Sequence, residues 1–117
     1  MQTLQQQRAK HALQQVKKLA ELDDREKLKS RASELPFMIH ANGLGQAAAF
    51  FKSKASDGYP HLYDILQSWL TQPGRRFAGK ASLMEAIVES DFRTYRAAQA
   101  EAMQFMDWVK KFAKAYL

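Results

Sequence analysis

Apolar residues recur along most of the chain at the three- and four-residue spacing that is typical of amphipathic helices. The first stripe follows Thr3-x-x-Gln6, a capping-box pattern that predicts a helix start. The second stripe follows Asp23 and Asp24, and Pro36 predicts that this helix kinks or restarts. The inward positions predicted for the two helices are Ala9, Ala12, Leu13, Val16, Leu19 and Ala20, then Leu28, Ala32 and Leu35.

Two further helices are predicted in the middle of the chain. One runs from about Leu44 to Lys54, and the next begins at the turn that includes Pro60, a residue suited to a first helical position. Their predicted inward residues are Leu44, Ala47, Ala48 and Phe51, then Leu62, Leu66, Trp69 and Leu70.

The last third begins with an irregular segment over residues 71–81. A short helix opened by Ser82 follows, and then a long helix that Ser90 or Asp91 caps and that reaches nearly to Leu117. The chain is therefore predicted to be all-α, a compact bundle of about six helices with a long C-terminal helix. The inward stripe predicted for this helix is Phe92, Tyr95, Ala98, Ala102, Phe105, Met106, Val109, Phe112, Ala113 and Tyr116, with Trp108 as a further core residue.

A Gly-x-Gly turn between the second and third helices resembles a phosphate-binding glycine loop. A dinucleotide fingerprint needs a third glycine where Ala48 stands, and a P-loop needs a lysine where Gln46 stands. We therefore interpret the turn as a helix C-cap. Asn42 and Gly43 are residue types that tolerate the left-handed backbone conformation that ends a helix, and Gly45 lets the next helix begin close against it.

Composition and charge narrow the class of protein. The 117 residues are predicted to form one helical domain over 1–117. A content of 46% hydrophobic and 26% charged residues is typical of a globular protein. No apolar run approaches membrane-spanning length and the N-terminus is too polar for a signal peptide, so a cytoplasmic protein without a membrane partner is expected. The net charge is +6, and the excess of basic over acidic residues lies in the first two-thirds of the chain. This excess indicates either a polyanionic partner or a solvated lysine-rich surface.

Catalytic and metal-binding patterns are sparse. The absence of cysteine excludes thiolate catalysis and cysteine-ligated zinc, and His11, His40 and His61 have no metal-ligand spacing. Glu85 and Glu89 lie one helical turn apart but lack a third ligand. No metal, no cofactor and no enzymatic activity are predicted.

Three segments carry a family resemblance. They are residues 7–19, with Gln7-Arg8-Ala9 and Ala12-Leu13; residues 35–54, with Leu35-Pro36-Phe37-Met38-Ile39, Asn42-Gly43-Leu44-Gly45-Gln46 and Ala49-Phe50-Phe51-Lys52-Ser53-Lys54; and residues 95–113, with Tyr95-Arg96, Glu101-Ala102 and Trp108-Val109-Lys110-Lys111-Phe112-Ala113. In them the chain resembles the small, all-helical subunit of the type III-B CRISPR–Cas effector, the Cmr RNA-silencing complex. Residues 56–81 match no pattern of that family.

The resemblance implies a non-catalytic role. Such a subunit stacks as a short inner filament beside the backbone subunits and helps form the channel where guide and target RNA pair, while other subunits cleave. The implied partners are the backbone and large subunits, guide RNA and target RNA, and stacking allows for self-association. The positive charge of the chain itself gives the candidate phosphate contacts Lys17, Lys18, Lys52, Lys54, Arg75 and Arg76. Lys52 and Lys54 have the best claim because they lie in a matched segment, whereas Arg75 and Arg76 rest on local charge density alone.

Two other functions are consistent with a small basic helical protein. The chain could be a free-standing protein–protein adaptor whose positive charge is incidental. It could also be a helix-turn-helix DNA-binding protein with its turn at Gly43-Leu44-Gly45, although the next helix, with Ala47 and Phe51, has the character of a core helix.

Overall fold

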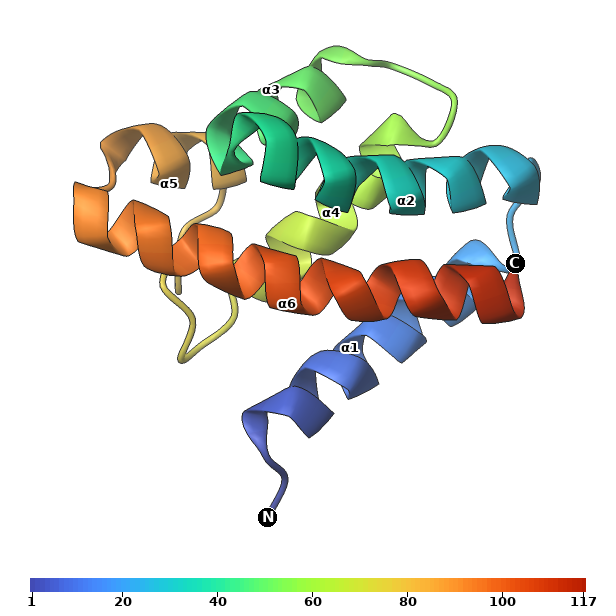
Figure 1. Cartoon of the computed structure of the whole chain (residues 1–117), viewed down its shortest axis with the longest axis horizontal. Coiled ribbons are helices and arrows are strands. Elements are labelled where there is room, and N and C mark those ends of the chain that lie inside the picture. Colours follow the sequence, from blue (N-terminus) through green and yellow to red (C-terminus); the bar gives the residue numbers. More distant parts are fainter.

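Six helices and no strands make up the structure, a computed structural model that describes residues 1–117. The predicted all-α fold with a long C-terminal helix is confirmed. α6 spans the molecule, α2 lies beside it, and α1 crosses it at an angle (Figure 1). The bounds are α1 Leu4–Leu19, α2 Arg25–Asn42, α3 Leu44–Ser53, α4 Tyr59–Leu70, α5 Leu83–Glu89 and α6 Phe92–Tyr116.

The core is one cluster of 27 buried hydrophobic residues to which every helix contributes. α6 supplies its central stripe, and α1 and α2 pack against that helix. Small buried residues on the facing helices, such as Ala12 and Ala32, let the helices approach α6 closely. The stripe of α6 comprises Ala98, Ala102, Phe105, Met106, Val109 and Ala113.

Several helix starts follow the predicted capping patterns. The Oγ1 of Thr3 accepts a hydrogen bond of 3.1 Å from the backbone N–H of Gln6, whose side chain accepts from the Thr3 N–H. Of the two candidates at the start of α6, Asp91 is the cap and accepts from the N–H of Thr94 at 2.8 Å. Ser82 caps α5 in the same way.

The second helix departs from the prediction at its start, and it does not restart at its proline. Asp24 precedes the helix with φ of 61° and makes no side-chain cap. α2 also continues through Pro36 as far as Asn42. Pro36 removes one backbone hydrogen bond, but Leu35 and Ile39 on either side are buried in the core, and this packing stabilises the helix across the proline.

The predicted inward stripe of α6 is right in its middle and wrong at its ends. Phe92 and Tyr116 are 72% and 47% exposed. Trp108 is half-buried rather than a full core residue. It stacks with Phe112 at the edge of the core, with ring centroids 5.5 Å apart.

The turn between α2 and α3 is the C-cap that its glycines predict. Gly43 has φ of 90° and ψ of 160°, and its N–H donates to the carbonyl of Ile39 at 2.8 Å. The N–H of Leu44, at the start of α3, donates to Oε1 of Gln99 on α6 at 2.8 Å. No helix of the chain combines the length and the apolar character that crossing a bilayer requires.

Candidate nucleic-acid interface

The six predicted phosphate contacts lie in three separate places. Lys17 and Lys18 belong to the last turn of α1, Lys52 and Lys54 lie at the end of α3, and the two arginines lie in the 71–82 loop. Figure 1 shows α3 on one side of α6 and this loop on the other. The structure therefore does not bring all six together into one patch.

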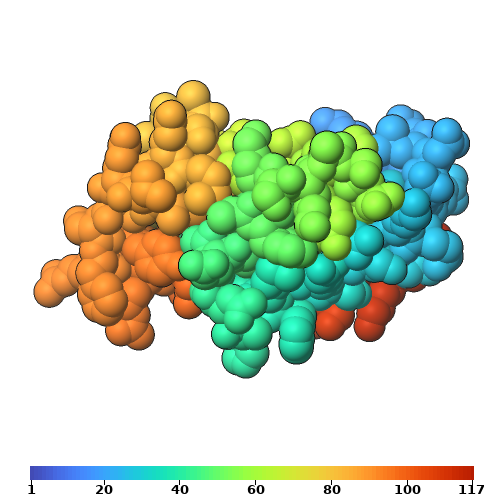
Figure 2. Space-filling view, turned by 90° about the horizontal axis from the view of Figure 1, so that it is seen from above, coloured from blue at the N-terminus to red at the C-terminus, as the bar shows by residue number.

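The two lysines at the end of α3 lie next to aromatic rings. The Nζ of Lys52 is 5.1 Å from the ring centroid of Tyr63, and the Nζ of Lys54 is 4.9 Å from that of Phe50. Both lysines are exposed and neither forms an ion pair, so their charges remain available to an anion. α3 and the connection to α4 lie on the face shown in Figure 2, in green.

The lysines of α1 have a structural role of their own. Lys17 and Lys18 are exposed in the last turn, where positive charge is favourable beside the negative end of the helix dipole. Neither forms an ion pair, so both also remain open to phosphate.

The two loop arginines differ from each other. Arg76 is exposed, whereas Arg75 is half-buried and its guanidinium lies 4.7 Å from the ring centroid of Trp69. Arg75 donates to Oε1 of Gln7 through a long contact of 3.4 Å, and its buried Nε has no hydrogen-bond partner. The loop is anchored by Phe77, which is buried in the core.

An ion pair between α1 and α6 adjoins this loop. Two guanidinium nitrogens of Arg8 donate to the two carboxylate oxygens of Glu101, at 2.6 and 2.9 Å, and both side chains are only 14% exposed. The indole N–H of Trp69 donates to the same carboxylate at 2.9 Å. Burial by itself raises the pKa of Glu101, but the hydrogen bonds from Arg8 and Trp69 outweigh it and hold that pKa below its ordinary value.

The functional candidates inferred from charge did not include Arg8 or Glu101. Both residues lie in segments that resemble the Cmr small subunit, but they are far apart in sequence, and nothing in their local context indicates that they pair.

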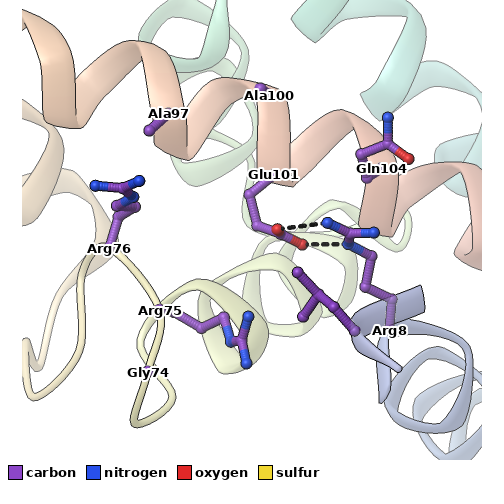
Figure 3. Close-up of a pocket in the computed structure, with 9 residues that line it drawn as sticks. Arg8, Gly74, Arg75, Arg76, Ala97, Ala100, Glu101 and Gln104 are labelled. Atoms are coloured by element: carbon purple, nitrogen blue, oxygen red, sulfur yellow. Dashed lines mark hydrogen bonds and ion pairs between the residues drawn. The ribbon is translucent and has the colours of Figure 1, made fainter. Parts of the chain in front are cut away.

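Arg8, Arg75 and Arg76 line one pocket, which we call the arginine pocket. Its other lining residues include Glu101, Ala97 and Ala100 of α6, and its volume is about 380 Å³. Figure 3 shows Arg76 extending from the loop toward Ala97, while Arg75 extends toward α1. Three guanidinium groups and one carboxylate give this pocket an excess of positive charge.

The histidines and paired glutamates take ordinary structural positions. His11 is half-buried, with its ring centroid 5.5 Å from that of Trp69 and 5.7 Å from that of Phe105, and it is hydrogen-bonded to Ser68. His40, His61 and Glu85 are exposed, and Glu89 pairs with Lys80 at 3.5 Å. No group of three or more histidine or carboxylate side chains is arranged to hold a metal ion.

Comparison with known proteins agrees with the helical fold and the resemblance. The family model of the CRISPR-associated protein Cas_Cmr5 matches residues 4–116. The CRISPR system Cmr subunit Cmr5 of Thermus thermophilus is 28% identical over 117 residues, covering all of this chain and 98% of the relative. The crystal structure of a CRISPR-associated Cmr5 family protein from Thermus thermophilus superposes with a TM-score of 0.85 at 27% identity, covering 100% of this chain and 99% of the other. The chain therefore belongs to the Cmr5 family, the small subunits of the type III-B Cmr effector.

Proposed function

We propose that the chain is the non-catalytic small subunit of a cytoplasmic type III-B CRISPR effector that acts in antiviral defence. In this role it forms part of an inner filament and helps to hold the guide–target RNA duplex. Its partners are the backbone and large subunits, the guide RNA and the target RNA, and stacking implies self-association. The observation that carries this proposal is the family match over residues 4–116.

The charge of the surface supports the RNA-binding part of the proposal. The chain carries +6, and Lys17, Lys18, Lys52, Lys54 and Arg76 are exposed and free of ion pairs. Recognition of a guide–target duplex relies on its shape and backbone charge, because base pairing supplies the sequence specificity. Cations spread over separate helix ends suit a long duplex, and they imply weak RNA affinity for the subunit alone.

Reconstitution of the effector with a charge-reversed subunit tests the proposal. Lys52→Glu with Lys54→Glu should weaken target-RNA binding for all sequences alike. Each lost phosphate contact should flatten the slope of log affinity against log salt by about 0.7 if the contacted strand is single. The control is Lys27→Glu with Lys29→Glu, which makes the same change in net charge. These two lysines already form ion pairs with Asp57 and Glu26. Equal affinities and slopes for all three complexes would leave the subunit as a scaffold without RNA contacts.

A free-standing protein–protein adaptor remains the second candidate function. Phe37, Val88 and Phe92 are large apolar side chains with most of their surface exposed, and such side chains are common where proteins meet. A gene neighbourhood without CRISPR repeats or effector subunits, together with failure to join a reconstituted Cmr complex, would favour the adaptor.

The proposed subunit has no catalytic activity of its own. The purified chain should leave RNA intact in the presence of divalent metal. Cleavage that survives rigorous purification and disappears on replacing Glu85 or Glu89 would contradict it.

A further inference from the structure

We propose that residues 4–11, the first half of α1, form an arm that opens separately from the rest of the fold, and that His11 makes this opening sensitive to protons. No residue of the arm is buried, whereas the second half of α1 contributes Ala12, Val16 and Leu19 to the core. In Figure 1 the start of α1 projects from the body of the molecule. The arm therefore lacks the apolar burial that supplies most of the stability of a helix in a protein.

Polar side chains attach the arm to α4, α6 and the end of α4. Arg8 donates to both carboxylate oxygens of Glu101, at 2.6 and 2.9 Å (Figure 3). The two ring nitrogens of His11 lie 2.8 Å from Oγ of Ser68 and 3.1 Å from the amide nitrogen of Gln72. Water replaces these hydrogen bonds once the arm opens, so their net contribution to closure is modest. The arm should therefore open more readily than the whole chain unfolds.

The hydrogen bonds around His11 specify one neutral form of its ring. The hydroxyl of Ser68 donates to the carbonyl of Ile65 at 2.6 Å, so its oxygen is left to accept from the Nε2–H of His11. The amide N–H of Gln72 donates to Nδ1, which therefore carries no proton. Protonation of the ring would place an N–H on Nδ1 opposite the amide N–H, and Gln72 would have to rotate before it could accept from it.

The surroundings of the ring also oppose a positive charge. Ser68, Trp69 and Gln72 of α4 are uncharged, and the ring of Phe105 on α6 has its centroid 5.7 Å away. The carboxylate of Glu101 is already paired with Arg8. The other charged side chains that adjoin this region are positive, namely Arg8, Lys10 and Lys18 of α1 and Arg75 against Trp69.

These surroundings bias the arm toward opening as the pH falls. Burial, and to a smaller extent the charge of Lys18, lower the pKa of His11 in the closed arm. In the open arm the ring is in water and regains its ordinary pKa of 6.5. The open arm therefore takes up a proton at a higher pH than the closed arm, and acid favours it.

Amide hydrogen exchange of the full-length chain tests both parts of the proposal. An undocked arm of about two turns is too short to remain helical, so opening exposes the amides of residues 8–11. The amides of residues 16–19, in the half of α1 that is packed in the core, are the internal reference. Exchange is measured at about pH 7.5 and about pH 5.5 and expressed as protection factors, which correct for the intrinsic effect of pH. Glu101 stays ionised throughout, because its pKa lies below 4.5.

The arm should exchange through an opening of its own. The protection of residues 8–11 should be uniform, lower than that of residues 16–19, and insensitive to small additions of urea, because a local opening exposes little surface. Protection that rises smoothly from residue 8 to residue 19 would mean ordinary fraying of a helix end. Equal protection with equal urea dependence in both halves would mean that α1 opens only when the whole chain unfolds. Either result would overturn the arm.

Three variants test how the arm is held. The protection of the arm should fall severalfold between the two pH values in wild type and in His40→Gln, with a ceiling of about tenfold for one histidine of ordinary pKa 6.5. This fall should disappear in His11→Gln. Glu101→Gln should lower the protection of the arm at both pH values and keep its response to pH. A response that persists in His11→Gln would overturn the role of His11, and unchanged protection in Glu101→Gln would overturn the attachment through Arg8.

Discussion

The hydroxyl of Tyr95 accepts a hydrogen bond of 2.9 Å from the backbone N–H of Gly45. Gln99, one turn further along α6, accepts from the neighbouring N–H of Leu44. These N–H groups lie in the first turn of α3, where no carbonyl within the helix can satisfy them. Two side chains of α6 therefore cap α3 and fix the α2–α3 corner to the long helix.

Removal of this hydroxyl should destabilise the protein. Tyr95→Phe keeps the ring but leaves the Gly45 N–H without its acceptor, so the free energy of unfolding should fall by about 1 kcal/mol. Urea denaturation measures the change. Tyr116→Phe is the matched control, because Tyr116 is exposed and makes no hydrogen bond, and its stability should stay within about 0.5 kcal/mol of wild type. Equal stability of all three proteins would mean that water replaces the Tyr95 hydroxyl.

The two glycines of the corner should respond differently to alanine. Gly43 has φ of 90° and ψ of 160°, a conformation that is nearly restricted to glycine, so Gly43→Ala should cost about 1–3 kcal/mol. Gly45 is helical, and an added Cβ would lie 3.4 Å from the Tyr95 hydroxyl, so Gly45→Ala should change stability by less than about 1 kcal/mol. Thermal unfolding of both variants decides the order, and a larger loss for Gly45→Ala would contradict this account.

The ion pair between Arg8 and Glu101 should show measurable coupling. Its charged, two-pronged hydrogen bonds are mostly shielded from water, so a double-mutant cycle with alanine should give about 1.5–3 kcal/mol. The exposed pair Lys111 and Asp107 is the control, and its coupling should not exceed about 0.5 kcal/mol. Similar values for the two pairs would show that burial adds nothing at the first.

Stability should decrease as the pH falls through the titration range of His11. Burial, with a smaller contribution from the positive charge of Lys18, lowers the pKa of His11 below its ordinary value of 6.5. The unfolded chain therefore takes up this proton at a higher pH than the folded protein. The contribution to stability is complete above pH 6.5 and is lost as the pH falls toward the lowered pKa.

Urea midpoints of wild type, His11→Gln and His40→Gln across this range provide the measurement. The slope should flatten in His11→Gln. His40→Gln removes an exposed histidine from the last turn of α2 and is the control for loss of a histidine as such. Identical slopes in the three proteins would assign the pH dependence to other groups.

The two tryptophans should differ in their importance for folding. Trp69 is 2% exposed and stacks on Phe105 with ring centroids 5.2 Å apart, so Trp69→Ala should cost about 3–5 kcal/mol. Trp108 is half-buried at the edge of the core, and Trp108→Ala should cost less than that range. Denaturation of both variants tests the order. Loss of complex assembly at unchanged stability would assign Trp108 to an intersubunit surface.

Local patterns predicted the elements of this fold because they depend on nearby residues. The caps at Thr3 and Asp91 and the glycine that ends α2 are interactions within a few residues, which a sequence displays directly. The helix does not restart at Pro36, one of the two predicted outcomes, because burial of the flanking side chains outweighs the lost hydrogen bond, and burial is a property of the whole core.

The sequence by itself determined the helical class, the positions of the helices and, through three matching segments, the family. Only the tertiary structure decided which charges are free. It places Arg75 against Trp69 and joins Arg8 to Glu101. The two members of each pair belong to different helices, or to a loop and a helix. Amphipathic periodicity shows which face of a helix turns inward, but it carries no information about which side chain of another helix will lie opposite, because that depends on how all six helices pack together.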